Sequence, residues 1–469
     1  MREKIVLVAL FPKKYRAFEE HLGLEYLKSS LEHANYQVTI IDGWLNELTV
    51  DTVYHEIMKI KDPLFIGISS YLDNTLPTIN LITRLKNGNP NVTIVCGGFG
   101  PTFHPENYLN NGADIVIRGE GEKVIVDVAN ALKNNTNLMD IEGICYKNNG
   151  IIICNKEASV IKDLDVIPFP SRCFFNEILK QKLPVNMLTS RGSTYHSTIS
   201  EFFKHNKGKC WRGRSIKNIV DEIESLYNQG VTNIKFIDDS FIDGDRGLKW
   251  SKNFVDELAS RNIKVRLTGN IRIEKVTDQI LKHLKRAGFY FFTCYIQKEV
   301  DSEKQIRKIL ELFQKYQLIV QLECDYCDKD ISLEDIYNFL KETNFVLSFD
   351  ALCIKGIGEP KIYEALKKWN DDCYDVYDMA VSPIITSRIL TEEEIAKFYD
   401  YAIKLKNKGL EVFKKLLEIV KENENADLLL IVDNEIKNNR NYYETIKKEL
   451  EELYAKNNLV YKRLKLPFI

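Results

Sequence analysis

The stretch Ile5-Val6-Leu7-Val8-Ala9-Leu10 places six consecutive apolar residues near the start of the chain, and Phe11-Pro12-Lys13-Lys14 ends the run. A run of this length suits a buried β-strand and is too short for a membrane helix. No convincing signal-peptide cleavage region follows it, so we expect the protein in the cytoplasm.

Runs of the same kind return through the first 135 residues, separated by amphipathic segments. The strand-like runs are Ile5–Leu10, Val38–Ile41, Leu64–Ser69, Val92–Cys96 and Asp114–Ile117. Helical spacing is found at Leu22–Glu32, Val50–Ile60, Leu76–Lys86 and Glu122–Leu132. This alternation predicts an α/β fold with a doubly wound, Rossmann-like parallel sheet, whose ligands bind beyond the carboxyl ends of the strands.

Three of the loops that follow these strands are rich in small or turn-forming residues. The candidate ligand contacts in them are Ser69, Ser70, Tyr71, Gly97, Gly98, Phe99, Gly100, Thr102, Gly119, Glu120, Gly121 and Glu122. Glycine lets a ligand approach the backbone closely, although a single glycine pair is more often an ordinary turn. Three such loops on one rim predict a large ligand.

Together with Leu22-Gly23-Leu24-Glu25-Tyr26-Leu27, these loops resemble the cobalamin-binding domain that precedes many radical S-adenosylmethionine (SAM) enzymes. The resemblance covers residues 1–135 and implies a corrinoid across the strand ends, with Leu22 and Gly23 among its contacts. The Asp-x-His-x-x-Gly loop of methionine-synthase-like corrinoid proteins is absent. We therefore predict no histidine ligand on the lower face of the cobalt, and expect His21 only to start a helix.

Residues 136–182 are predicted to form a hairpin and a linker. The segment from Gly143 to Cys154 contains an Asn-Gly pair, which favours a two-residue hairpin turn. The segment from Asp163 to Arg172 carries two prolines and reads as a connection between domains.

A second α/β series begins at Val185. Its expected strands are Val185–Thr189, Ile234–Asp238, Lys264–Thr268, Tyr290–Ile296, Leu318–Glu323 and Phe345–Cys353, with helical patterns such as Ile216–Tyr227 and Asp278–Ala287 between them. Six strand–helix units predict a partial (β/α)6 TIM-type barrel over residues 183–382, with its chemistry at the C-terminal strand ends. Residues 383–469 are rich in Glu and Lys and predict a separate helical region with solvated charges.

Around residue 200 the chain resembles a cobalamin-type radical SAM domain. The resemblance rests on Ser190-Arg191-Gly192, Thr194-Tyr195-His196 and Trp211-Arg212-Gly213-Arg214-Ser215. In that family three cysteine thiolates hold a [4Fe-4S] cluster, but here Ser193, Ser197 and Ser200 occupy the three positions. A serine hydroxyl is a hard ligand and stays protonated near neutral pH, so we expect neither the cluster nor another metal there.

S-adenosylmethionine remains a candidate second cofactor. The segment Ile234–Phe241 resembles the part of the family that meets the methionine amine, and Asp238 or Asp239 could pair with an ammonium group. An acidic helix cap explains these two carboxylates equally well. Tyr195 and Gln297 are the other candidate contacts, but Ile199, Gln297 and the segment after Leu322 depart from the family pattern.

Three interpretations of the serines stay open. The chain is a natural, cluster-free relative, either inactive or using cobalamin for different chemistry; or an engineered cluster knockout of an active B12-dependent methyltransferase; or a non-catalytic scaffold that binds an active homologue. The family analogy implies methylation or radical transformation of a small-molecule or carrier-bound substrate.

Charge and cysteine content limit the partners further. The 65 basic and 67 acidic residues nearly cancel, which argues against nucleic acid or a membrane surface as a partner. The ten cysteines have no framework spacing and are expected to be reduced thiols.

Overall fold

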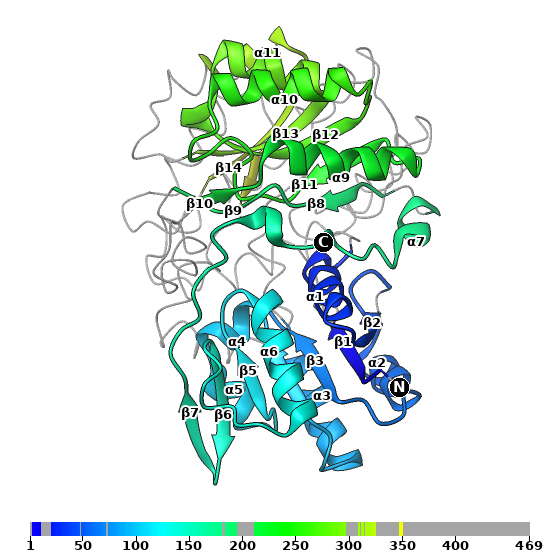
Figure 1. Ribbon diagram of the computed structural model, residues 1–469. Coiled ribbons are helices and arrows are strands. Elements are labelled where there is room, and N and C mark those ends of the chain that lie inside the picture. The colour runs from blue at the N-terminus through cyan, green and yellow to red at the C-terminus, as the bar shows by residue number, and fades with distance from the viewer. Residues whose placement is uncertain are drawn as a thin grey trace, which may run out of the picture. The chain divides into compact units, whose positions relative to one another are not determined.

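The computed structural model describes residues 2–10, 20–46, 48–71, 74–180, 183–194, 211–296, 308–309, 311–313, 315–324 and 347–349. Contacts divide the chain into two compact units, one of Met1–Ile178 with Ser190–Asn218 and the other of Leu179–Thr189 with Ile219–Ile469. The predicted C-terminal helical region, residues 383–469, lies outside the described residues. Each unit is built around its own sheet (Figure 1).

The first unit contains a seven-stranded sheet in the order β2-β1-β3-β4-β5-β6-β7. Its strands are β1 (Lys4–Ala9), β2 (Gln37–Asp42), β3 (Phe65–Ser69), β4 (Ile94–Gly97), β5 (Ile115–Ile117), β6 (Ile144–Asn148) and β7 (Ile151–Cys154). The first five are parallel, and β6 and β7 continue the sheet in antiparallel fashion. The predicted doubly wound sheet is confirmed, and the hairpin belongs to the same sheet.

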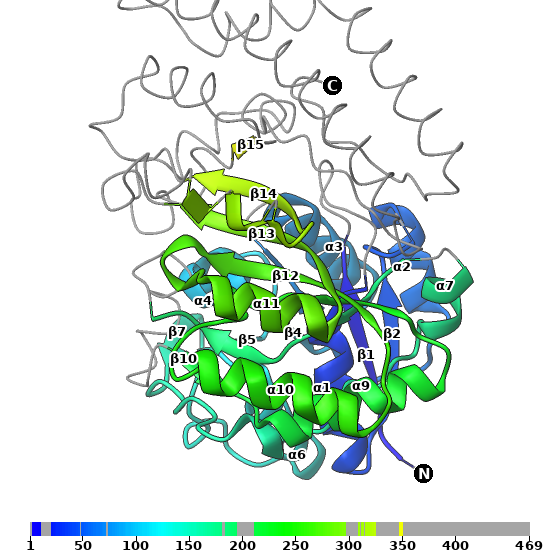
Figure 2. The same cartoon turned by 90° about the horizontal axis from the view of Figure 1, so that it is seen from above.

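Helices cover both faces of this sheet because successive strand residues point to opposite sides. In β1, Val6 and Val8 belong to one apolar cluster, whereas Ile5, Leu7 and Ala9 belong to the other. The first cluster contains side chains of α2 (Val50–Met58), α3 (Thr75–Gly88) and α5 (Pro105–Leu109), and the second those of α1 (Leu22–His33) and α6 (Gly121–Asn134). The short α4 (Phe99–Phe103; Figure 2) and α5, neither of which the sequence predicted, form the connection after β4.

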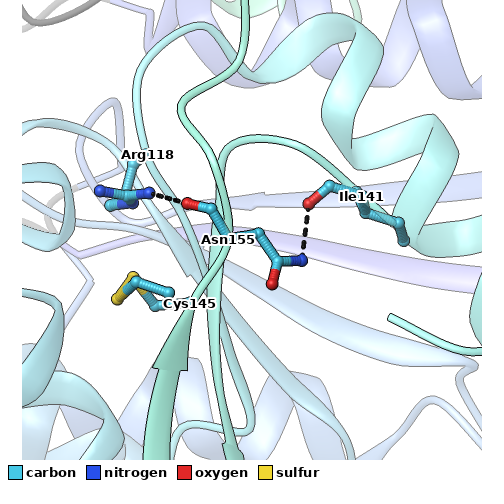
Figure 3. The surroundings of a disulfide bond; sticks show 5 residues. Arg118, Ile141, Cys145 and Asn155 are labelled. Carbon is cyan, nitrogen blue, oxygen red and sulfur yellow. Dashed lines mark hydrogen bonds between the residues drawn. A yellow bond between two sulfur atoms is a disulfide. The ribbon is translucent and has the colours of Figure 1, made fainter. Parts of the chain in front are cut away.

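The β6–β7 hairpin turns at Asn149 and Gly150, whose φ angles of 48° and 80° give the primed turn expected for an Asn-Gly pair. Cys145 and Cys154 are directly opposite in the register and form a disulfide (Figure 3). The prediction that all cysteines are reduced is therefore wrong for this pair. Their pairing depends on the hairpin register, which cysteine spacing alone does not reveal.

The linker is anchored to α1 by buried carboxylates. Glu25, which is 1% exposed, accepts hydrogen bonds from the Ser171 hydroxyl at 2.9 Å and from the Cys173 backbone N–H at 3.1 Å. Arg172 forms an ion pair with Glu20 at 2.7 Å. The linker thus packs as part of the first unit, and the short helices η1 (Leu164–Val166) and α7 (Phe175–Lys180) lie on either side of these anchors.

The second unit contains a six-stranded parallel sheet in the order β15-β14-β13-β12-β11-β8. Its strands are β8 (Val185–Met187), β11 (Asn233–Phe236), β12 (Arg266–Arg272), β13 (Phe289–Ile296), β14 (Ile319–Cys324) and β15 (Leu347–Phe349). The helices α9 (Ile216–Asn228), α10 (Leu248–Ser260) and α11 (Asp278–Ala287), with the short η2 (Ile273–Lys275), lie between strands in the chain. Each of the six predicted strands is present and parallel; closure into a barrel stays a prediction.

A separate two-stranded antiparallel sheet joins β9 (Ser190–Gly192) to β10 (Trp211–Gly213) and belongs to the first unit. Arg191 and Arg212 are directly opposite each other in its register. Within the part of the chain that the structure describes, no helix combines the length and the apolar character needed to cross a membrane.

Candidate functional site

The loops after β3 and β4 are locked together by buried polar contacts around Ser70. The Ser70 N–H donates to the Gly97 carbonyl at 2.9 Å, and the Gly100 N–H donates to the Ser70 carbonyl at 3.1 Å. The Ser70 hydroxyl donates to Asn74 Oδ1 at 2.9 Å and lies 2.9 Å from the Tyr108 hydroxyl. These loops therefore form a connected rim at the carboxyl ends of the strands.

Two glycines of this rim, Gly98 and Gly100, leave no room for a side chain because atoms of neighbouring segments lie close to them. Gly98 has φ of 99°, and a Cβ added there would lie 2.7 Å from the Ser70 carbonyl oxygen. A Cβ on Gly100 would lie 2.4 Å from the Tyr108 hydroxyl. The sequence assigned both glycines to close approach by a ligand, but packing between loops is sufficient to explain them.

Three aromatic rings gather where β1, β2 and β3 end. The His21 ring lies 5.4 Å from that of Trp44 and 5.8 Å from that of Tyr71, and the Trp44 and Tyr71 rings are 5.4 Å apart. The strand order 2-1-3-4-5 puts the topological switch point between β1 and β3, where doubly wound sheets bind ligands. The rings therefore lie at the switch point. Of the three, the sequence prediction had named only Tyr71 as a contact.

Both nitrogens of His21 have hydrogen-bond partners. As predicted, His21 starts α1: it is the N-cap, and its Nδ1 accepts from the Leu24 N–H at 3.3 Å, just beyond Leu22 and Gly23. Its Nε2 lies 3.2 Å from the Ser69 hydroxyl. Because Nδ1 accepts, this arrangement assigns the ring proton to Nε2.

Asp42, at the end of β2, holds this corner of the rim in place. Its carboxylate accepts from the backbone N–H groups of His21 at 3.0 Å, Trp44 at 2.8 Å and Leu45 at 3.0 Å. Burial raises the pKa of Asp42 even though these three donors oppose the rise. The sequence did not identify Asp42 or Trp44, although an acidic residue directly after a predicted strand was an available signal.

The third rim loop follows β5 and leads into α6. Gly119, with φ of 85°, donates its N–H to the Thr102 hydroxyl at 3.0 Å, which ties this loop to the one after β4. Glu120 is the N-cap of α6. The three predicted loops therefore share one edge of the sheet, and hydrogen bonds connect each to the next.

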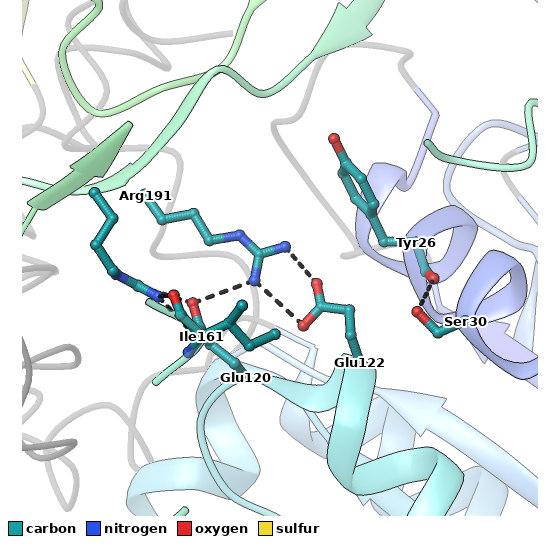
Figure 4. A network of polar contacts seen from close by, with 7 residues as sticks. Tyr26, Ser30, Glu120, Glu122, Ile161 and Arg191 are labelled. Atoms are coloured by element: carbon teal, nitrogen blue, oxygen red, sulfur yellow. Dashed lines mark hydrogen bonds and ion pairs between the residues drawn. The ribbon is translucent and has the colours of Figure 1, made fainter. Parts of the chain in front are cut away.

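Glu120 and Glu122 are engaged by two arginines of the β9–β10 sheet (Figure 4). Glu120 accepts from Arg212 at 2.8 and 3.0 Å, from Arg191 at 3.2 Å and from the Ile161 N–H at 2.7 Å. Glu122 pairs with Arg191. Burial alone would raise the pKa of Glu120, but the hydrogen bonds and charges of the arginines outweigh burial and lower it. Glu120 and Glu122, which were predicted to contact a corrinoid, therefore have their carboxylates bound by groups of the protein itself.

In the second unit, Asp238 lies at the C-terminal end of β11 and is bound to the end of β8. Its Oδ1 accepts from the Thr189 N–H and hydroxyl, both at 2.9 Å, and its backbone carbonyl accepts from Asn270 at 2.8 Å. Arg246 donates to the Thr189 hydroxyl at 2.7 Å. This carboxylate holds adjacent strand ends together, a role that differs from the helix cap offered as the alternative.

Asp239, beside it, has a different environment. Burial, together with the negative charges of Asp238 and Asp243, raises the pKa of Asp239 to about 7. A nearby cation would favour its ionised form. Of the remaining predicted residues, Ser193 is buried directly after β9, whereas Tyr195, Ser197, Ser200 and Gln297 lie outside the described residues. Among the described residues, no group of three or more potential metal ligands is present.

Comparison with known proteins matches the parallel part of the first sheet to a known domain. Residues 14–129 match the B12 binding domain. The chain is 30% identical over 294 residues to an uncharacterized methyltransferase of Pyrococcus horikoshii, covering 60% of this chain and 61% of that protein. It is 25% identical over 300 residues to the anaerobic magnesium-protoporphyrin IX monomethyl ester cyclase of Synechocystis, covering 61% and 58%. The chain thus spans about three fifths of the length of these curated relatives.

Two solved structures share the fold. The cobalamin-dependent S-adenosylmethionine radical enzyme OxsB with aqua-cobalamin bound gives a TM-score of 0.66 at 16% identity, covering 99% of this chain and 83% of that one. The radical S-adenosylmethionine methyltransferase TsrM of Kitasatospora setae gives 0.60 at 17% identity, covering 74% and 72%. The chain therefore has a B12 binding domain and the fold of cobalamin-dependent radical SAM enzymes.

Proposed function

We propose that the rim of the first sheet binds a corrinoid and that the chain acts in cobalamin-dependent methyl transfer or a related transformation of a small-molecule or carrier-bound substrate. One observation carries the proposal: the loops of the matched B12 binding domain form a connected rim at the switch point of the sheet. When bound, cobalamin supplies a cobalt atom that can accept and pass on a methyl group. This chain's residues would bind the ring system and limit its access to water.

The rim residues fit a large, mostly apolar ring bearing amide groups. The partly exposed Tyr71 offers apolar surface and packs against the buried ring of Trp44, and the backbone of the Gly97–Gly100 and Gly119–Gly121 loops offers hydrogen-bonding groups. His21 would not ligate cobalt, because Nδ1 accepts from Leu24 and the proton on Nε2 faces Ser69. The corrinoid would therefore bind without His21 as a ligand.

The residues at the three cluster positions do not fit an iron–sulfur cluster. The serines at 193, 197 and 200 supply hydroxyl groups where soft thiolates are needed. We infer that the chain holds no [4Fe-4S] cluster. If S-adenosylmethionine binds, Asp239 is the better candidate for its ammonium group, because Asp238 Oδ1 accepts two hydrogen bonds from Thr189.

A titration of the full chain with hydroxocobalamin tests the corrinoid proposal. We expect the purified protein to retain the corrinoid through gel filtration, with its absorbance co-eluting at one equivalent per chain. Tyr71→Ala should weaken binding roughly two- to tenfold, because an aromatic contact contributes roughly 0.5–1.5 kcal/mol. Tyr54→Ala is the matched control, since it removes the same side chain from α2 in the same unit.

Failure of the unmodified chain to retain hydroxocobalamin at saturation would contradict the proposal and favour the scaffold interpretation. Equal weakening by the two tyrosine variants would contradict the assignment to the rim. Iron and sulfide analysis after reconstitution tests the cluster inference separately. A brown protein with stoichiometric iron and sulfide would show that inference to be wrong without affecting corrinoid binding.

A further inference from the structure

The β9–β10 sheet contains an electrostatic conflict that Glu120 resolves. Arg191 and Arg212 are directly opposite in the antiparallel register, and like charges in that position destabilise strand pairing. The side chain of Arg212 is 5% exposed and that of Arg191 is 11% exposed, so water screens their repulsion only weakly. An anion between them offsets this repulsion and favours the pairing of these two strands.

Glu120 supplies that anion and contacts both strands at once. Arg212 binds its carboxylate in a bidentate manner, at 2.8 Å to Oε1 and 3.0 Å to Oε2, and Arg191 reaches the same Oε1 at 3.2 Å. The Ile161 N–H completes the set at 2.7 Å, and the Ile161 carbonyl accepts from Arg212. Figure 4 shows the Arg191 and Ile161 contacts converging on Glu120.

The backbone of Glu120 belongs to the rim. It lies between Gly119 and Gly121, and the Gly119 N–H is bound to Thr102 in the neighbouring loop. A ligand that contacts the backbone of Gly119 or Gly121 therefore restricts the position of the Glu120 carboxylate. That carboxylate in turn determines whether Arg191 and Arg212 can lie opposite each other.

We propose that Glu120 is a positioning residue through which corrinoid binding at the rim stabilises the pairing of β9 with β10. The inference rests on the proposed function and concerns its regulation. The strands border residues 193–210, which contain all three serines. Binding free energies are reciprocal, so a stable strand pair also tightens corrinoid binding.

Hydrogen exchange of the full chain, with and without saturating hydroxocobalamin, tests this coupling. The readout is the change in exchange caused by the ligand in peptides covering Ser190–Gly192 and Trp211–Gly213. In the unmodified protein we expect the ligand to slow exchange there about tenfold. In Glu120→Gln, with hydroxocobalamin raised until absorbance shows the site filled, the ligand should change exchange less than twofold.

Two further variants separate coupling from a structural role. Glu142→Gln removes a carboxylate from a solvent-exposed pair with Lys156 in the same unit and should respond to hydroxocobalamin like the unmodified chain. The double variant Glu120→Gln with Arg212→Gln removes the anion and one of the opposed cations together. Exchange in both strands should be slower in the double variant than in Glu120→Gln alone. As in Glu120→Gln, adding hydroxocobalamin should change exchange in these strands less than twofold.

Each outcome decides a different point. Equal slowing in Glu120→Gln and the unmodified protein, both with filled sites, would overturn the inference and leave the proposed function intact. A ligand response in the double variant would also overturn it. No retention of hydroxocobalamin by the unmodified chain would overturn the proposed function, and this inference with it.

Discussion

Replacing Gly98 by alanine tests whether the rim glycines are needed by the protein or by the ligand. Gly98 has φ of 99° and ψ of −166°, a conformation that is open essentially to glycine alone and costs a residue with a Cβ about 1–3 kcal/mol. The new methyl group would also lie 2.7 Å from the Ser70 carbonyl oxygen, and relieving such an overlap costs about 1–3 kcal/mol. We therefore expect Gly98→Ala to lower the stability of the first unit by about 2–6 kcal/mol.

Gly150→Ala is the matched control, because Gly150 has φ of 80° with nothing within 4 Å of an added Cβ. Its cost should be the conformational part alone, about 1–2 kcal/mol. Native-state hydrogen exchange of the β1 amides in the full chain gives both free energies of opening. Equal costs for the two variants would refute the packing explanation. Normal stability of Gly98→Ala with lost hydroxocobalamin binding would show that the glycine is there for the ligand.

Three further predictions concern other parts of the chain. Changing all three serines at 193, 197 and 200 to cysteine should allow reconstitution with iron and sulfide, measured chemically, whereas Ser193→Cys alone should not. The pKa of Asp239 in the folded protein is raised to about 7, so the folded state binds more protons than the unfolded state between about pH 4 and 7. The free energy of unfolding should therefore fall as pH rises through that window. Asp239→Asn should remove the contribution of Asp239 to this fall, measured by urea titrations at several pH values. Reduction of the Cys145–Cys154 disulfide, which joins residues nine apart, should lower stability by about 2–3 kcal/mol, checked by thermal unfolding with and without a dithiol.

Most strands and long helices of both sheets could be predicted because each buries its own regular apolar pattern. The predicted Val38–Ile41 lies within β2, and the predicted helix Leu22–Glu32 is one residue shorter than α1. The short α4 and α5 were missed, since two five-residue helices around Gly100 and Pro105 have no apolar periodicity to detect.

The sequence predicted which backbone segments form the candidate site, but not which side chains contact one another there. Loop composition correctly indicated that three segments share an edge of the first sheet, because parallel strands end together. Side-chain partners were not predictable, since Glu120 is separated from Arg212 by 92 positions and from Arg191 by 71. The sequence treated the two motifs that contain these arginines as family markers, whereas in the structure their side chains neutralise the first turn of α6.

The anchoring of α1 and α6 by later residues limits how the B12 binding domain can be moved between proteins. A chain cut after residue 135 would keep every strand of the parallel part but lose Arg191 and Arg212, and Glu25 would lose Ser171 and Cys173. Without these residues the carboxylates would be open to water, and a foreign partner packed over them would bury them without their donors, at a cost of several kcal/mol. Fusion of this segment to a foreign partner would therefore require new cations over Glu120 and Glu122 and new hydrogen-bond donors over Glu25.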